Sequence, residues 1–85
     1  MVSKKVKINE EAGLHLRPAG KLCNEAIKYK SKITMKSNNV NANAKSVISV
    51  LSACVRCGNE IEFVCEGEDE EEALAAMIDV IQELL

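Results

Sequence analysis

The segment from residue 13 to residue 20, Gly-Leu-His-Leu-Arg-Pro-Ala-Gly, carries the side chains best suited to chemistry. It holds the only histidine, His15, the only proline, Pro18, and one of the two arginines, Arg17. Proline is favoured in the first turn of a helix, where its missing N–H would lack a partner anyway. We therefore expect His15 just before a helix N-terminus, where backbone N–H groups and the helix dipole attract anions. This combination suits a phosphoryl group held on the histidine.

The chemistry of such a site follows from its residue types. An imidazole nitrogen is largely unprotonated near neutral pH, so His15 can act as a nucleophile. Phosphoryl transfer needs positioning and charge stabilisation more than covalent machinery. Backbone N–H groups around Leu16 and Arg17 are natural donors to the phosphoryl oxygens, and the Arg17 guanidinium adds a planar donor fork. We expect no metal and no cofactor. Without its context, His15 would be an ordinary loop residue.

Seven elements must position this segment, and hydrophobic periodicity predicts each of them. Strands alternate with period two, and helices show apolar residues at three- and four-residue spacing. The helix after Pro18 has its apolar stripe at Ala19, Leu22, Cys23, Ala26 and Ile27. A hairpin turn is expected at residues 37–39, and Ser46 is a good N-cap for the short second helix. The predicted ranges are strands 2–8, 32–36, 40–44 and 60–66, and helices 18–29, 46–54 and 69–85.

The order βαββαβα predicts an α+β fold in one domain, residues 1–85. Each strand has one apolar face and each helix one apolar stripe, so three helices on one face of a four-stranded antiparallel sheet satisfy both. We expect the first and fourth strands to be neighbours, because opposite charges across a ladder stabilise it. The face left to water carries charged side chains: Lys5, Lys7, Lys32, Lys36, Glu60 and Glu62.

Bulk properties exclude several classes of function. A net charge of −2 and the absence of tryptophan argue against a nucleic-acid partner. No apolar run approaches the roughly 18 residues of a membrane helix. The start of the chain, Met1–Lys5, lacks the apolar stretch of a signal peptide, so a cytoplasmic protein is expected.

The four cysteines are expected to be inert thiols. Cys54 and Cys57 form a C-x-x-C pair, but the pair follows a helical pattern rather than a first strand, and a second ligand pair for zinc is absent. Cys23 and Cys65 fall on predicted apolar faces. A thiol or metal-handling module using Cys54 and Cys57 stays open as a distant alternative.

The whole chain resembles the HPr family, the histidine-containing phosphocarriers of the bacterial sugar phosphotransferase system. The resemblance rests on Gly13-x-His15-x-Arg17-Pro18-Ala19, on Lys45-Ser46, and on the acidic run 66–70. It implies an open-faced β-sandwich and a carrier rather than an enzyme. His15 would accept a phosphoryl group from phosphorylated enzyme I and pass it to enzyme IIA of a sugar permease, while Arg17 would steady the phosphohistidine. We expect a monomer.

Ser46 has two interpretations. It is an N-cap on sequence grounds, and the resemblance adds regulatory phosphorylation by a dedicated kinase, with a transcriptional regulator as a further partner. Phosphate at a helix N-terminus should leave the fold intact. A regulatory paralogue that acts mainly through phosphorylation-dependent binding is the alternative function.

Partner docking is expected on a surface shared by the starts of the first two helices. Such a surface would be a small apolar patch with a basic rim, suited to brief, charge-steered contacts. Several positions depart from the usual family pattern, including Leu16, Gly20, Ser49 and the cysteine pair, and Leu16 and Gly20 leave the partners open. The predicted docking residues are Leu16, Lys21, Lys45, Val47, Ile48 and Leu51.

Overall fold

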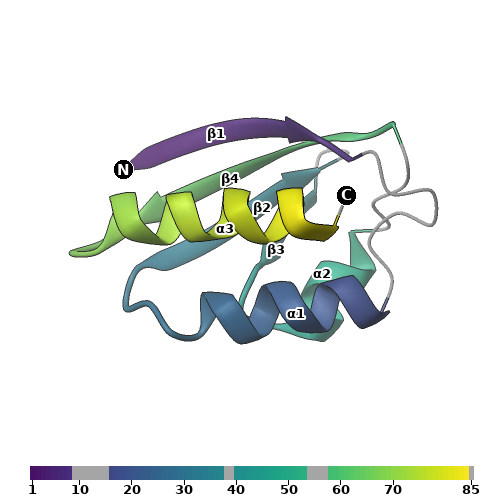
Figure 1. Cartoon of the computed structure of the whole chain (residues 1–85), viewed down its shortest axis with the longest axis horizontal. Helices are drawn as coiled ribbons and strands as arrows, with labels where there is room; N and C mark the ends of the chain where they lie inside the picture. The colour runs from purple at the N-terminus through teal and green to yellow at the C-terminus, as the bar shows by residue number, and fades with distance from the viewer. Residues whose placement is uncertain (9–15, 38–39, 54–57, 85) are drawn as a thin grey trace.

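The computed structural model describes residues 1–8, 16–37, 40–53 and 58–84, and of residues 16–18 and 84 it describes the backbone only. The predicted βαββαβα order is confirmed (Figure 1). The elements are β1 (Val2–Lys7), α1 (Leu16–Ala26), β2 (Lys32–Ser37), β3 (Val40–Asn43), α2 (Val47–Ser52), β4 (Glu60–Glu66) and α3 (Glu70–Leu84).

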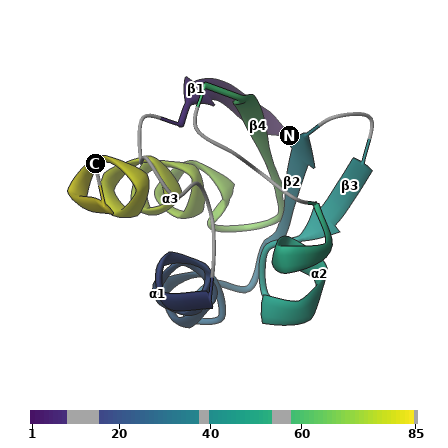
Figure 2. The same ribbon diagram turned by 90° about the vertical axis from the view of Figure 1, so that its right-hand side faces the viewer.

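The described strands form one antiparallel sheet in the order β1-β4-β2-β3, and the helices cover one of its faces (Figure 2). The first and last strands are neighbours, as predicted from their charges. Lys5 lies opposite Glu62, and Lys7 lies opposite Glu60. The other face of the sheet carries the predicted charged side chains, so the fold is an open-faced sandwich.

The core lies between the sheet and the helices. On β4 the inward residues Ile61, Phe63 and Cys65 are buried, and on β2 the same holds for Ile33 and Met35. Each alternation places one face of the strand against the helices, as the period-two pattern predicted. The helices contribute a buried stripe: Ala19, Leu22, Cys23, Ala26, Val50, Ala73, Met77, Ile78 and Ile81.

The first helix differs from its prediction. It begins two residues earlier, at Leu16, and ends at Ala26 rather than near residue 29. Ile27, expected on the apolar stripe, is 61% exposed. After Ile27 the backbone tightens to three-residue hydrogen bonds, from Lys28 N–H to the Glu25 carbonyl and from Tyr29 N–H to the Ala26 carbonyl. Ile27 itself still bonds the Cys23 carbonyl at 3.0 Å, so the α-helical stripe ends at this turn, with Ile27 on its exposed edge.

The stripe of α3 differs from its prediction at its first position. Met77, Ile78 and Ile81 are buried as expected, but Leu74 is half-buried and Ala73 is fully buried in its place. The small Ala73 side chain lets α3 approach the sheet closely near the start of the helix. Leu85 and the Leu84 side chain, the two alternatives for the end of the stripe, lie outside the description. None of the described helices is long and apolar enough to cross a membrane.

A polar contact ties the loop before β2 to the start of α3. The Asp69 carboxylate accepts hydrogen bonds from Lys30 N–H at 3.0 Å, from Ser31 N–H at 2.9 Å and from the Ser31 hydroxyl. Gly67 packs directly against Ser31 in the same corner. This corner fixes where α3 leaves the sheet, and therefore how α3 packs on α1.

Candidate phosphoryl-transfer and docking site

The start of α1 lies directly after His15 in the sequence. Because α1 begins at Leu16, Arg17 is its second residue, which confirms the predicted place of Arg17 in the first turn. Pro18 is the third residue and supplies no N–H. His15 and the Arg17 side chain lie outside the described residues, so their roles remain predictions.

The first turn of α1 has the electrostatic character that an anion requires. The turn itself contains no acidic residue, so no carboxylate within it offsets the positive end of the helix dipole. Within the helix, the first amides have no carbonyl four residues earlier to bond. Leu16 and Arg17 therefore have N–H groups that the helix itself does not pair, and a phosphoryl group near the helix start would meet them.

The body of α1 is a firm platform for its first turn. Its inward side chains Ala19, Leu22 and Ala26 are completely buried, and Cys23 is 3% exposed. Gly20 lies half-buried beside them, with no atom within 4 Å of the place where a Cβ would stand. The helix is thus anchored along one side and leaves its glycine side open for contact.

Ser46 is confirmed as the N-cap of α2. Its backbone is extended, with φ −119° and ψ 117°, and its hydroxyl oxygen accepts the Ser49 N–H at 3.3 Å. The preceding turn is held by Asn43, whose side-chain oxygen accepts the Lys45 N–H at 2.9 Å. The Ser46 side chain is half-buried, so its hydroxyl caps α2 and still borders solvent.

The apolar docking residues on α2 lie as predicted with respect to burial. Ile48 is 78% exposed, because it lies off the buried stripe that Val50 anchors. Val47 and Leu51 are half-buried and pack against the core. The Leu16 side chain lies outside the described residues. An exposed isoleucine above two half-buried aliphatic residues forms a small apolar surface.

The two lysines expected around this apolar surface lie elsewhere. Lys21 lines a hollow between α1 and α3 with Asn24, Lys28 and Val80, because the helical period aligns it with the α3 side of α1. The Lys45 ammonium donates to the Tyr29 carbonyl at 2.7 Å, just beyond the end of α1. In the free chain these two lysines thus contact α3 and the end of α1, and their part in partner docking stays a prediction.

The Lys45–Tyr29 contact also corrects the expected meeting of the two helix starts. It brings the start of α2 to the end of α1. The eleven residues of α1 are about 16 Å long at 1.5 Å per residue. The two helices do pack against each other, but the starts lie at opposite ends of α1. Any surface shared by α1 and α2 therefore runs along their sides.

A hydrogen bond that the sequence did not predict joins Ser49 of α2 to Asn43 of β3. The Ser49 hydroxyl accepts the Asn43 N–H at 2.8 Å and thereby covers the free edge of β3. Ser49 also donates its own N–H to Ser46, so it links the cap of α2 to the sheet. A serine one turn after an N-cap was visible in the sequence, but its partner on β3 was not.

Two cysteines lie within the described residues, and both are free and buried. Burial raises the pKa of the Cys23 thiol. Burial also raises the pKa of the Cys65 thiol, helped by the charges of Glu70 and Asp69. Both sulfurs are therefore protonated and unreactive at neutral pH, as predicted for core thiols. Cys54 and Cys57 lie outside the description.

Comparison with known proteins decides the family. Residues 2–83 match the family described as "PTS HPr component phosphorylation site". The chain belongs to the HPr family. Phosphocarrier protein HPr of Treponema pallidum is 40% identical over 77 residues, 91% of this chain and 88% of that protein.

Solved HPr-family structures have the same fold. HPr-C-His from Thermoanaerobacter tengcongensis superposes with a TM-score of 0.94 at 37% identity, covering 99% of this chain and 94% of that one. The Bacillus subtilis protein Crh, described as a dimer with a swapped domain, gives a TM-score of 0.78 at 35% identity, covering 98% and 95%. The HPr family thus includes relatives of two kinds, phosphocarriers and Crh.

Proposed function

We propose that this HPr-family chain is a phosphocarrier whose phosphoryl-accepting residue is His15. An imidazole nitrogen of His15 attacks the phosphoryl group of phosphorylated enzyme I. The new N–P bond forms as the bond to the donor breaks. The chain then gives the group to an enzyme IIA domain of a sugar permease. In this role it is a protein substrate of other enzymes and not an enzyme itself.

The observation that carries the proposal is the position of α1. The helix begins one residue after His15, with Arg17 in a first turn that has no acidic residue. The first-turn amides and the Arg17 guanidinium are suited to the phosphoryl oxygens. A site exposed to partners, rather than a metal cage, suits a carrier that must release its cargo. The exposed Ile48 surface on α2 is the proposed docking contact for these partners, together with Leu16, Val47 and Leu51.

The test is intact mass after incubation with enzyme I, phosphoenolpyruvate and magnesium. Wild-type protein should gain one acid-labile phosphoryl group, about 80 Da, and His15→Ala should gain none. Arg17→Gln should load more slowly, because it lacks the planar cation. Ser46→Ala is the matched control and should load normally. Wild-type protein that is folded by circular dichroism and gains no mass from several enzymes I would contradict the proposal.

A second candidate function is regulatory, and the place of Ser46 favours it. Its hydroxyl caps α2 next to the Ser49 N–H, so an added phosphate would meet the positive end of α2 rather than break the fold. A serine kinase of the HPr kinase type with ATP should then add an acid-stable phosphate, absent in Ser46→Ala. Binding of the product to a transcriptional regulator, without transfer from enzyme I, would make regulation the main role.

The oligomeric state distinguishes the two kinds of relative further. We propose a monomer, whereas the Crh relative is described as a dimer. Light scattering at several protein concentrations tests this directly. A dimer at all concentrations, together with failure to load His15, would favour the regulatory role.

A further inference from the structure

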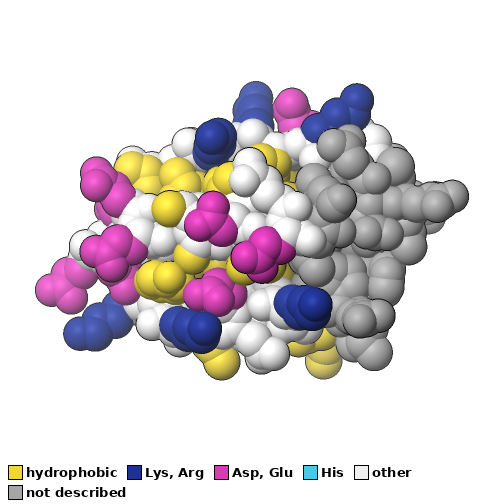
Figure 3. Space-filling view, viewed as in Figure 1, with side chains coloured by type: hydrophobic (Ala, Val, Ile, Leu, Met, Phe, Trp, Pro, Cys, Tyr) yellow, Lys and Arg dark blue, Asp and Glu magenta, His cyan; other side chains and the backbone are white. Residues whose placement is uncertain are grey.

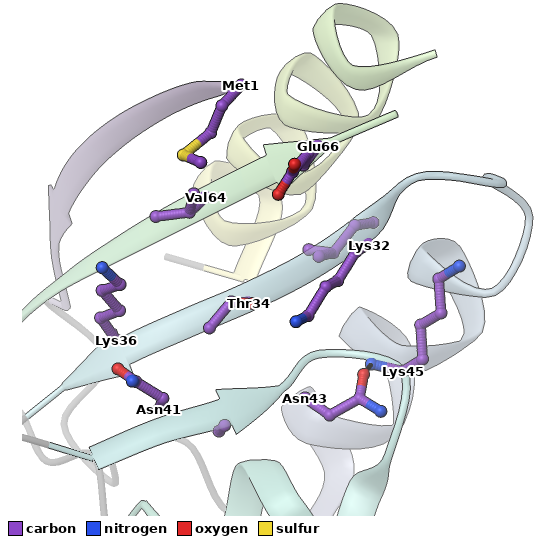
Figure 4. A pocket seen from close by; sticks show the side chains of 11 residues that line it. Met1, Lys32, Thr34, Lys36, Asn41, Asn43, Lys45, Val64 and Glu66 are labelled. Carbon is purple, nitrogen blue, oxygen red and sulfur yellow. Dashed lines mark hydrogen bonds between the residues drawn. The ribbon is translucent and has the colours of Figure 1, made fainter. Parts of the chain in front are cut away.

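The face of the sheet opposite the helices carries a hollow that the phosphocarrier role does not use. It has a volume of about 560 Å³ and lies over β4, β2 and β3 (Figure 4). Apart from Met1 and Lys45, every residue that lines it belongs to one of these three strands. The hollow therefore has a floor of sheet and little wall. A drug-sized ligand needs an enclosing pocket, so this shape favours a macromolecular partner.

The charge of the hollow is predominantly positive. Lys32, Lys36 and Lys45 line it, and Glu66 is its one carboxylate. The helix side has the opposite character near the start of α3, where acidic side chains gather (Figure 3). On a chain of net charge −2, this segregation directs an acidic partner to the sheet face and away from α3.

Three donor side chains of the hollow have no partners within the described part of the chain. Neither the Lys32 nor the Lys36 ammonium makes a hydrogen bond or ion pair there, and the same holds for the Asn41 amide. Figure 4 shows Lys32 and Lys36 on either side of Thr34 along β2, with Asn41 beside Lys36. Lys45 differs, because its ammonium is bonded to the Tyr29 carbonyl. Two cations on β2 and an amide on the neighbouring strand β3 are thus unpaired among the described residues.

The spacing of these groups matches an extended polypeptide. Lys32, Thr34 and Lys36 project from the same face at every second residue, so the two lysine Cα atoms are about 13 Å apart. An extended segment with acidic residues at the same period presents its carboxylates at matching intervals. We propose that the sheet face is a docking surface for an acidic, extended polypeptide segment of a partner protein, with Lys32 and Lys36 as its main contacts.

This surface is separate from the proposed docking contact on α2. The helices cover one face of the sheet (Figure 2), and the side chains that line the hollow project from the other face, with the helices behind the sheet in Figure 4. A partner on the sheet would leave the start of α1 and the Ile48 surface uncovered. The chain would then hold one partner on its sheet while another exchanges phosphate with His15. The binding surface itself does not depend on the phosphocarrier proposal.

The test is nuclear magnetic resonance titration of the 15N-labelled full chain with a synthetic peptide of alternating glutamate and threonine. At low ionic strength, shifts should centre on the amides of Lys32, Thr34, Lys36, Asn41 and Asn43. A peptide with glutamine in place of glutamate should produce none. Added salt should weaken binding, because the lysines are exposed and their charges are screened.

Charge-matched variants separate a specific surface from general attraction. Lys32→Gln with Lys36→Gln should weaken peptide binding about tenfold at low salt. Lys4→Gln with Lys28→Gln removes the same charge elsewhere and should leave binding within about twofold. Equal losses in the two double variants would overturn the proposal. So would equal shifts from free glutamate at the same carboxylate concentration, which would show anion attraction only. His15 loading of Lys32→Gln with Lys36→Gln should match wild type.

Discussion

Gly67 offers the sharpest test of how the corner between β4 and α3 is built. Its backbone has φ +152°, a region that side chains with a Cβ rarely adopt. A Cβ added there would stand 2.7 Å from the Ser31 hydroxyl oxygen and 2.8 Å from the Ser31 Cα. The second contact is with backbone, so a rotated side chain does not relieve it. Gly67→Ala must therefore strain its own backbone and displace the strand that follows Ser31.

The expected cost is the sum of two effects. Backbone strain at a glycine-only conformation is of order 1–3 kcal/mol, and overpacking adds roughly 1–3 kcal/mol. We expect Gly67→Ala to lower the free energy of unfolding by about 2–6 kcal/mol. For a domain of this size, each kcal/mol lowers the melting temperature by roughly 4–8 °C. A loss of at least about 8 °C should therefore be visible.

Two other glycines serve as matched controls. Gly58 has φ +90° but no described atom beyond its chain neighbours within 4 Å of an added Cβ, so Gly58→Ala should cost only the strain, about 1–2 kcal/mol. Gly20 lies within α1 with the same open space, so Gly20→Ala should stabilise by up to about 1 kcal/mol. Urea unfolding followed by circular dichroism measures all three. A cost for Gly67→Ala no greater than that for Gly58→Ala would refute the close contact with Ser31.

The remaining predictions concern polar groups. Ser37→Ala should raise the unfolding free energy by up to about 1 kcal/mol, because the buried Ser37 hydroxyl has no hydrogen-bond partner among the described residues. A clear loss of stability in urea unfolding would be inconsistent with that. Ser31→Ala should instead cost about 1 kcal/mol, since Ser31 is equally buried but donates to Asp69. Ser46→Ala should cost about 1 kcal/mol and Ser46→Asp much less, as expected for an N-cap; equal losses would argue against the cap. Hydrogen bonds from Ser31 and Lys30 lower the Asp69 pKa from 3.8 to about 2. The contribution of the Asp69 carboxylate to the free energy of unfolding is therefore complete above pH 3.8 and is lost as the pH falls towards 2. In acid titrations, the difference in stability between wild type and Asp69→Asn should vanish over that range.

Patterns within a few residues determined the order of the elements and most of their faces. The period-two alternation of β4 predicted the burial of Ile61, Phe63 and Cys65, and that burial is confirmed. The Ser46 cap and the position of Arg17 in the first turn of α1 were also predicted. These features depend on hydrogen bonds and side-chain directions that repeat every two to four residues, so the sequence contains them directly.

Contacts between distant segments were decided only by the tertiary structure. Ser31 and Asp69 are 38 residues apart, and they meet because β2 and α3 leave the sheet at the same corner. Lys45 meets Tyr29 because α2 starts beside the end of α1, which separates the two helix starts. Such contacts depend on how packed elements align, and on where a helix ends. The same alignment turns Lys21 towards α3 and brings side chains of β3 and β4 beside those of β2. Local sequence patterns do not determine that alignment.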